Sequence, residues 1–360
     1  MAFQIAWENH LLDSQAVQSC LLTEGEQGAA AEIWPELGAN CLRWRVASQQ
    51  GPVELLYVHP EWPSAPARQR SGIPVLFPFP NRIRNGRFTW DGKDYVLELN
   101  DPHRRHSIHG FACRSAWRVV DCCAQATRAR LTVEFRLAVD APHLALCWPG
   151  DVRVTLQYVL THQALMMVAT MDNPGTKAVP VGLGYHPYFR VPWISHGSLD
   201  ECRVQVAASH CWTLSDRIPV GTHSPLDPQR DLQQAQPVSQ LQLDDVYTGF
   251  APLRGGQTMR CLSRLSQDRV GRLEIWASAG FRELVVFTPD HRQAICLEPY
   301  TCVTDAIHLQ QQGVDAGLRI LQPGESVTES IVYLFVPHGD DAVALSGAEH
   351  SEKVRSLLAG

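Results

Sequence analysis

Apolar and polar residues alternate along several stretches of the chain. Residues 131–139 (LTVEFRLAV) carry an apolar side chain at every second position, residues 151–160 repeat the pattern, and residues 203–207 show it more briefly. A period of two is typical of a β-strand with one face on a core and the other towards solvent. Residues 331–336 (IVYLFV) are continuously apolar, and residues 326–336 together are predicted to form a final, well-buried strand.

Glycine and proline divide the chain into short segments. Asp91-Gly92, a favoured pair for a tight hairpin turn, separates residues 88–90 from residues 95–99. Two longer polar or proline-rich segments, residues 59–80 and 219–242, are predicted to be irregular connections. Helical periodicity is scarce outside residues 349–358, in a polar tail that covers residues 338–360. We therefore expect an all-β protein, a large antiparallel β-sandwich that forms a single domain over residues 1–337.

Composition narrows the classes of partner. The 360 residues are 45% hydrophobic and 19% charged, and the formal net charge of -6 argues against a nucleic-acid partner. No apolar run is long enough to span a membrane, and the N-terminus has no basic region followed by an apolar run. The 11 cysteines form no C-x-x-C pair, which favours reduced thiols and a cytoplasmic protein. A small, neutral or mildly polar ligand is expected, bound by a monomer or homodimer.

Two polar segments follow apolar runs in the first third of the chain. Asn81 and Arg82 come directly after one such run, so Arg82 either braces a loop or presents its donors to sugar hydroxyls or a carboxylate. His106 and His109 are three apart, which in an extended chain puts them on opposite faces, so we expect no metal site there. His109 precedes Gly110, where a ligand is expected to approach the backbone closely.

Two further segments carry titratable groups that suit proton transfer. His186 lies in residues 181–189 (VGLGYHPYF), beside Tyr188 and held extended by the following proline; it is either a structural residue or a general acid or base. Glu298 follows four apolar or thiol residues, so burial is expected to raise its pKa towards that of a general base. An acidic pair, Asp244 and Asp245, either binds sugar hydroxyls or forms a plain turn. Nucleotide-binding and serine-hydrolase motifs are absent from the sequence.

Read in order, these segments resemble the aldose 1-epimerase (galactose mutarotase) family. The resemblance covers roughly residues 30–336 and rests on PFPNRI at 78–83, SIHG at 107–110, GYHPYF at 184–189, LDD at 243–245 and LEP at 297–299. It implies a β-supersandwich without metal or organic cofactor.

The resemblance also implies a role for each candidate residue. Glu298 matches the general base that takes the proton of the anomeric hydroxyl, and His186 matches the general acid that protonates the ring oxygen. The residues that match the sugar-binding positions are Asn81, Arg82, His109 and Asp244, and we expect Tyr188, Phe189 or Trp148 to supply an apolar platform for the sugar.

Three departures from the family pattern leave alternatives open. Pro187 and Tyr188 replace a polar residue and an aromatic, and the adjacent Asp244 and Asp245 leave open which of the two contacts the sugar. The basic insertion at residues 103–106 (HRRH) suggests either a solvated loop or a preference for a phosphorylated or acidic hexose. A non-catalytic carbohydrate-binding protein on the same scaffold is the alternative from another class.

Overall fold

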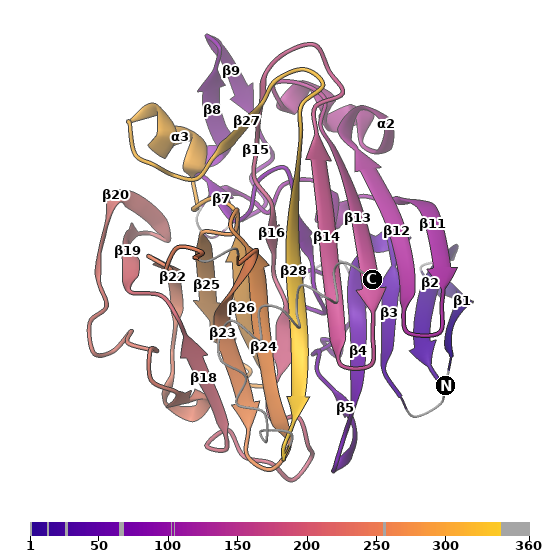
Figure 1. Ribbon diagram of the computed structural model, residues 1–360. Coiled ribbons are helices and arrows are strands. Elements are labelled where there is room, and N and C mark those ends of the chain that lie inside the picture. Colours follow the sequence, from indigo (N-terminus) through magenta and orange to yellow (C-terminus); the bar gives the residue numbers. More distant parts are fainter. Residues whose placement is uncertain are drawn as a thin grey trace.

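Antiparallel sheets make up almost all of the regular structure in the computed structural model, which describes residues 2–12, 14–25, 28–64, 68–101, 103, 105–254 and 257–339 (Figure 1). The fold is therefore all-β, as predicted. The largest sheet has nine strands in the order β11 (Arg118–Ala124), β12 (Ala129–Arg136), β13 (Arg153–Leu160), β14 (Ala164–Asp172), β28 (Ser326–Pro337), β24 (Gly271–Ser278), β23 (Met259–Gln267), β18 (Cys202–Val206) and β21 (Gln236–Pro237).

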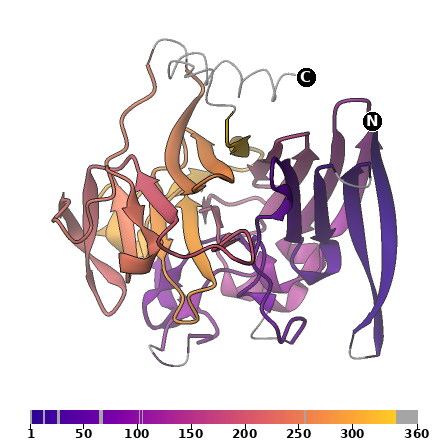
Figure 2. The ribbon, with the colours of Figure 1, turned by 90° about the horizontal axis from the view of Figure 1, so that it is seen from below.

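A second large sheet carries most of the candidate site. Its order is β20 (Ile218–Pro225), β19 (His210–Ser215), β22 (Asp244–Thr248), β25 (Glu283–Phe287), β26 (Ala294–Tyr300), β16 (Gly184–Tyr185) and β6 (Val75–Leu76), and β17 (Tyr188–Arg190) also pairs with β26. The N-terminal sheet comprises β1 (Phe3–Leu12), β2 (Gln15–Glu24), β3 (Ala30–Trp34), β4 (Asn40–Ser48) and β5 (Gly51–Glu54). Figure 2 shows these N-terminal strands on one side of the molecule and the red and orange strands of the second sheet on the other.

The remaining elements are short. Three ribbons of two strands pair β7 (Arg82–Ile83) with β10 (Ser107–Ile108), β8 (Arg87–Trp90) with β9 (Lys93–Val96), and β15 (Val179–Val181) with β27 (Arg319–Leu321). The helices are α2 (Leu137–Asp140), α3 (Ala306–Gln311) and the 3-10 turns η1 (Pro35–Leu37), η2 (Arg84–Gly86), η3 (Ala112–Arg114), η4 (Pro142–Cys147) and η5 (Val238–Gln240). Among the described residues, no helix is both long and apolar enough to cross a membrane.

The core lies where the nine-stranded sheet packs against the other two large sheets. Tyr333 of β28 is fully buried, and its ring centroid lies 6.2 Å from that of Trp44 in β4 and 5.7 Å from that of Phe189 in β17. Because side chains alternate along a strand, Ile331 and Phe335 point into the same core. The strand predicted over residues 326–336 is thus confirmed as a central strand of the sandwich.

Two other sequence predictions need correction. Residues 219–242 are not a single loop, because β20 extends to Pro225 by pairing with β19. The strand predicted over residues 131–139 ends at Arg136, where the Asp140 carboxylate accepts the Arg136 backbone N–H at 2.7 Å and the chain turns into α2.

The hairpin at Asp91-Gly92 is confirmed, since both residues have positive φ (48° and 71°). The helix considered for residues 349–358 lies outside the described residues.

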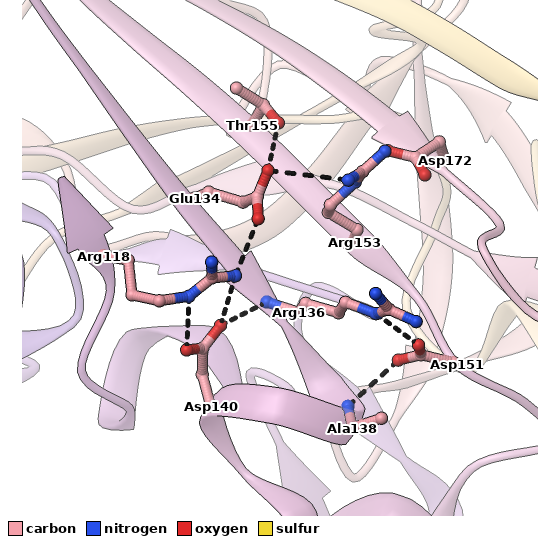
Figure 3. Close-up of polar contacts among 9 residues, drawn as sticks. All are labelled: Arg118, Glu134, Arg136, Ala138, Asp140, Asp151, Arg153, Thr155 and Asp172. Atoms are coloured by element: carbon pink, nitrogen blue, oxygen red, sulfur yellow. Dashed lines mark hydrogen bonds and ion pairs between the residues drawn. The ribbon is translucent and has the colours of Figure 1, made fainter. Parts of the chain in front are cut away.

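A network of ion pairs crosses strands β11 to β14 (Figure 3). Arg118 of β11 contacts both Glu134 of β12 (2.6 Å) and Asp140 of α2 (2.8 Å). Further pairs join Arg136 to Asp151 (2.6 Å) and Arg153 to Asp172 (2.8 Å). The polar positions of the alternating pattern therefore contact one another across the strands, while the apolar positions of β12 and β13 face the core.

Candidate active site

Strand pairing brings the two predicted proton-transfer residues face to face. Gly184 pairs with Tyr300, and Tyr188 pairs with Cys296 in the same antiparallel register. Continued through the residues between, this register places His186 opposite Glu298, although they are far apart in the chain. The Nε2 atom of His186 lies 3.4 Å from Oε1 of Glu298. The spatial convergence that the sequence could not show is therefore present.

Three rings surround the His186 imidazole. The Tyr188 ring stacks on it nearly parallel, with centroids 4.6 Å apart, and the Tyr188 hydroxyl lies 3.5 Å from His186 Nε2. The His109 ring meets it edge-on at 5.3 Å, and the Phe287 ring does so at 6.5 Å. The backbone N–H of His186 donates to the Pro74 carbonyl at 3.0 Å. The ring and the backbone of His186 are thus both held in place.

A cleft of about 1180 Å³ lies over these residues. His109, Tyr188 and Phe287 line it, and the rings of all three lie against His186, which is 8% exposed and contacts Glu298, 2% exposed. Its other walls come from loops and strand ends, and they consist of Gln69, Arg70, Arg82, Asn100, Asp101, His103, Ile108, Arg114, Arg217, Arg230, Gln242, Leu243, Asp244, Asp245, Pro289, Asp290 and His291. A cleft with an apolar floor and many polar walls suits a ligand such as a sugar.

Burial dominates the electrostatics of Glu298. It raises the pKa of the carboxyl well above its ordinary value, and the nearby Asp244 carboxylate raises it further. The Tyr300 hydroxyl, which donates to Oε2 of Glu298, and the Arg82 guanidinium both oppose this rise. Tyr300 follows Glu298 by two positions on β26, so the period of the strand could have identified it from the sequence.

Burial acts on His186 in the opposite direction. It lowers the pKa of the imidazole to about 3, and Arg82 contributes to the lowering, while a backbone hydrogen bond opposes it. Burial thus favours the neutral form of each group, which is a protonated carboxyl for Glu298 and an unprotonated imidazole for His186. Transfer of the carboxyl proton across 3.4 Å gives a carboxylate and an imidazolium without changing the net charge of the pair. One acid and one base are thus available together.

Arg82 is held over the pair by two acceptors. Its Nε donates to Asp101 at 2.7 Å, and its Nη1 donates to the Asn81 side chain at 3.0 Å. Asn81 does not line the cleft; its carbonyl instead accepts the backbone N–H of His109 at 2.8 Å. Asn81 thus contacts Arg82 and His109, and its predicted contact with substrate stays a prediction.

The register of β22 separates the two candidate carboxylates. Asp244 pairs with Phe287, whose ring contacts His186, so the Asp244 side chain lies on the same face as the acid–base pair. It forms an ion pair with Arg217 at 3.1 Å. Asp245 forms an ion pair with Arg230, whose Nε lies 2.8 Å from the Asp245 carboxylate. Both residues line a neighbouring cavity of about 490 Å³. The geometry favours Asp244 as the residue that faces a bound sugar.

A tight turn fixes His109, which has φ of 67°. Gly110 follows with φ of 65°, and a Cβ there would lie 2.3 Å from the carbonyl oxygen of Phe77. The close approach predicted at Gly110 is therefore that of the Phe77 backbone, not of a ligand. His106 lies apart from His109 and accepts the Asn85 backbone N–H at 3.1 Å.

We predict that Gly110→Ala destabilises the protein more than Gly92→Ala. Each change forces alanine into the left-handed region, which costs about 1–2 kcal/mol. An added Cβ at Gly92 meets nothing within 4 Å, whereas at Gly110 it clashes with backbone. Urea unfolding followed by circular dichroism measures both variants; equal losses of unfolding free energy would contradict the packing argument.

Two aromatic residues that were predicted to pack against the sugar, Trp148 and Phe189, do not line the cleft. Trp148 is 2% exposed, lies among Phe79, Phe88 and Phe111, and donates its indole N–H to the Pro180 carbonyl. Phe189 is fully buried in the core because it points to the opposite face of β17 from Tyr188. Tyr188 lines the cleft as predicted, and Phe287, which the sequence did not single out, lies beside it.

Comparison with known proteins agrees with this geometry. The aldose 1-epimerase family model matches residues 19–334. The chain belongs to the aldose 1-epimerase family. A relative, the uncharacterized protein YphB of Escherichia coli, is 26% identical over 310 residues, which cover 82% of this chain and 96% of YphB.

Solved structures of galactose mutarotase-like proteins share the fold. One from Clostridium acetobutylicum has a TM-score of 0.80 at 21% identity and covers 92% of this chain and 98% of its own. The galactose 1-epimerase of Lactobacillus acidophilus has a TM-score of 0.71 at 16% identity, with coverage of 93% and 99%. Membership of the aldose 1-epimerase family supports a general role in sugar epimerisation or mutarotation.

Proposed function

We propose that this protein is a mutarotase that interconverts the α and β anomers of a free hexose. The observation that carries the proposal is the contact of 3.4 Å between His186 Nε2 and Glu298 Oε1 beneath a cleft lined by Tyr188 and Phe287. A site that only binds a sugar needs no matched acid and base, whereas mutarotation needs two positioned proton transfers and nothing else.

In the proposed mechanism the sugar lies on the Tyr188–Phe287 floor with its anomeric carbon near the pair. Glu298, as the carboxylate, removes the proton of the anomeric hydroxyl while His186, as the imidazolium, protonates the ring oxygen. The ring opens to the aldehyde, the C1–C2 bond rotates, and closure on the other face reverses both transfers. His109 contacts His186 from the side and is positioned to stabilise developing charge, and Asp244 accepts from a ring hydroxyl.

Charge balance in the cleft favours a neutral sugar. Five arginines line it, and four of them contact a carboxylate: Arg82, Arg114, Arg217 and Arg230. Of the described residues of the basic insertion, His103 lines the cleft, whereas His106 accepts the Asn85 backbone N–H. We therefore propose a neutral hexose in preference to a phosphorylated or acidic one.

Polarimetry on freshly dissolved α-D-glucose and α-D-galactose tests the activity. The expected result is a rate of mutarotation above that of buffer for at least one neutral hexose, with glucose 6-phosphate turned over no faster than glucose. A preference for the phosphate would contradict the choice of substrate class. Rates equal to buffer for every sugar, together with sugar binding in calorimetry, would replace the enzyme by a binding protein.

Burial of the imidazole predicts that His186 does not titrate near neutral pH. An ordinary imidazole gains a proton as the pH falls through 6.5, but burial holds the pKa of His186 near 3 and that of Glu298 above its usual range. We therefore expect the His186 ring of the ligand-free protein to stay unprotonated between roughly pH 5 and 8, so that its NMR signals do not shift across this range. A shift of the His186 ring signals centred near pH 6.5 would show that His186 titrates as an exposed imidazole.

A further inference from the structure

A thiol lies beside the acid–base pair. Cys296 precedes Glu298 by two positions on β26, so both side chains point to the same face of the strand. An imidazole nitrogen of His186, the sulfur of Cys296 and a carboxylate oxygen of Glu298 all lie within 4.8 Å of one another. All three side chains are buried, and Cys296 is a free thiol. The mechanism above uses His186 and Glu298 but gives Cys296 no part.

Nitrogen, sulfur and oxygen donors in one cluster are the ligands that zinc prefers. In a tetrahedral site with bonds of about 2.1 Å, two such ligand atoms are separated by about 3.4 Å. The distance between His186 Nε2 and Glu298 Oε1 is 3.4 Å. The sulfur needs to lie about 3.6 Å from each of the other two atoms, and because all three atoms already lie within 4.8 Å, each sulfur distance has to shorten by no more than about 1.2 Å. Three protein ligands leave a fourth position for water.

We propose that His186, Cys296 and Glu298 form a binding site for a thiophilic divalent cation of the zinc class, and that the bound ion inhibits the enzyme. Binding requires the Cys296 thiol and the protonated carboxyl group of Glu298 each to lose a proton to the buffer, and the thiolate, the carboxylate and an imidazole lone pair then coordinate the ion. The ion inhibits because it occupies the same lone pairs that accept and return protons during mutarotation. The inhibition rests on the proposed function, whereas the binding does not.

Metal binding is measured first, on the full chain freed of metal by a chelator and kept reduced by a phosphine. Zinc chloride is titrated in a calorimeter, and cobalt(II) is used as a spectroscopic probe, because cobalt bound to a thiolate absorbs in the near ultraviolet. We expect one tight site per chain, with the thiolate band, in the wild type. Cys296→Ala is expected to lose the band and to weaken zinc binding at least about tenfold, as removal of one of three ligands requires.

Cys302→Ala is the matched control. Cys302 is also a buried free thiol, but it packs in a separate apolar cluster with Val303 and Ala316. This variant is expected to bind zinc and cobalt as the wild type does. A band that survives in Cys296→Ala, or equal zinc affinity in the two variants, would overturn the proposed site.

Inhibition is measured separately, by polarimetry with and without zinc. Cys296→Ala is expected to keep basal activity within about threefold of the wild type and to resist zinc concentrations that inhibit the wild type, and added chelator should restore the wild-type rate. Equal inhibition of both proteins would overturn the inhibitory role while leaving the mutarotase proposal intact. If no sugar is turned over, the proposed function fails. The calorimetric and cobalt measurements then still show whether the metal binds at the proposed site.

Discussion

Glu298→Gln is expected to lower kcat by about 10²–10⁴-fold, because the amide cannot accept the proton of the anomeric hydroxyl. KM should change little, since the amide keeps the shape of the side chain and retains an oxygen that accepts from the Tyr300 hydroxyl. Polarimetry across a range of sugar concentrations separates the two constants. Full activity in this variant would remove the carboxyl group from the mechanism.

Glu283→Gln is the control for this substitution. Glu283 lies on the neighbouring strand β25, is fully buried, and accepts the indole N–H of Trp212 at 2.9 Å, yet it does not line the cleft. Burial raises the pKa of its carboxyl to about 7. Its replacement removes a buried carboxyl group of the same sheet without touching the proton-transfer pair, so kcat should stay within a few-fold of the wild type.

His186→Asn is expected to cause a loss of similar size, about 10²–10⁴-fold in kcat, because protonation of the ring oxygen loses its donor. The double variant with Glu298→Gln should be little worse than the poorer single variant, since the two groups act as one unit. Multiplicative losses in the double variant would mean that the two side chains act independently. His103→Ala, on the exposed rim of the cleft, is the control and should retain activity.

The alternating pattern predicted the fold well because it reflects the burial of one face of each strand. Residues 151–160 form β13 nearly as expected, and the period of two also explains why Tyr188 faces the cleft while Phe189 faces the core. The pattern failed at residues 137–139, where the alternation continues but the Asp140 carboxylate captures the Arg136 backbone N–H and ends the strand. A side-chain contact of this kind leaves no trace in the periodicity.

Residue type and the family resemblance predicted which residues belong to the candidate site, but they did not predict which of these residues contact one another. Glu298 and His186 stood out because a carboxylate and an imidazole are unusual in apolar runs, whereas Asp101, which orients Arg82, lies in an ordinary polar segment. The sequence likewise did not indicate that Asn81, which is predicted to bind the sugar, contacts Arg82 and His109. Such positioning roles depend on the path of loops that the local sequence does not encode.

The pairing of residues 184–190 with 294–300 has a consequence for how this scaffold can change. Both halves of the proton-transfer pair are carried on one antiparallel ladder, so a slip of a single residue would turn Glu298 into the apolar interior and bring Leu297 out beneath the cleft. Substitutions on the surrounding loops leave this ladder unaltered, whereas an insertion or deletion within it reverses which side chains are available for chemistry. New substrate preferences can therefore arise at the rim, while the centre tolerates no change in length.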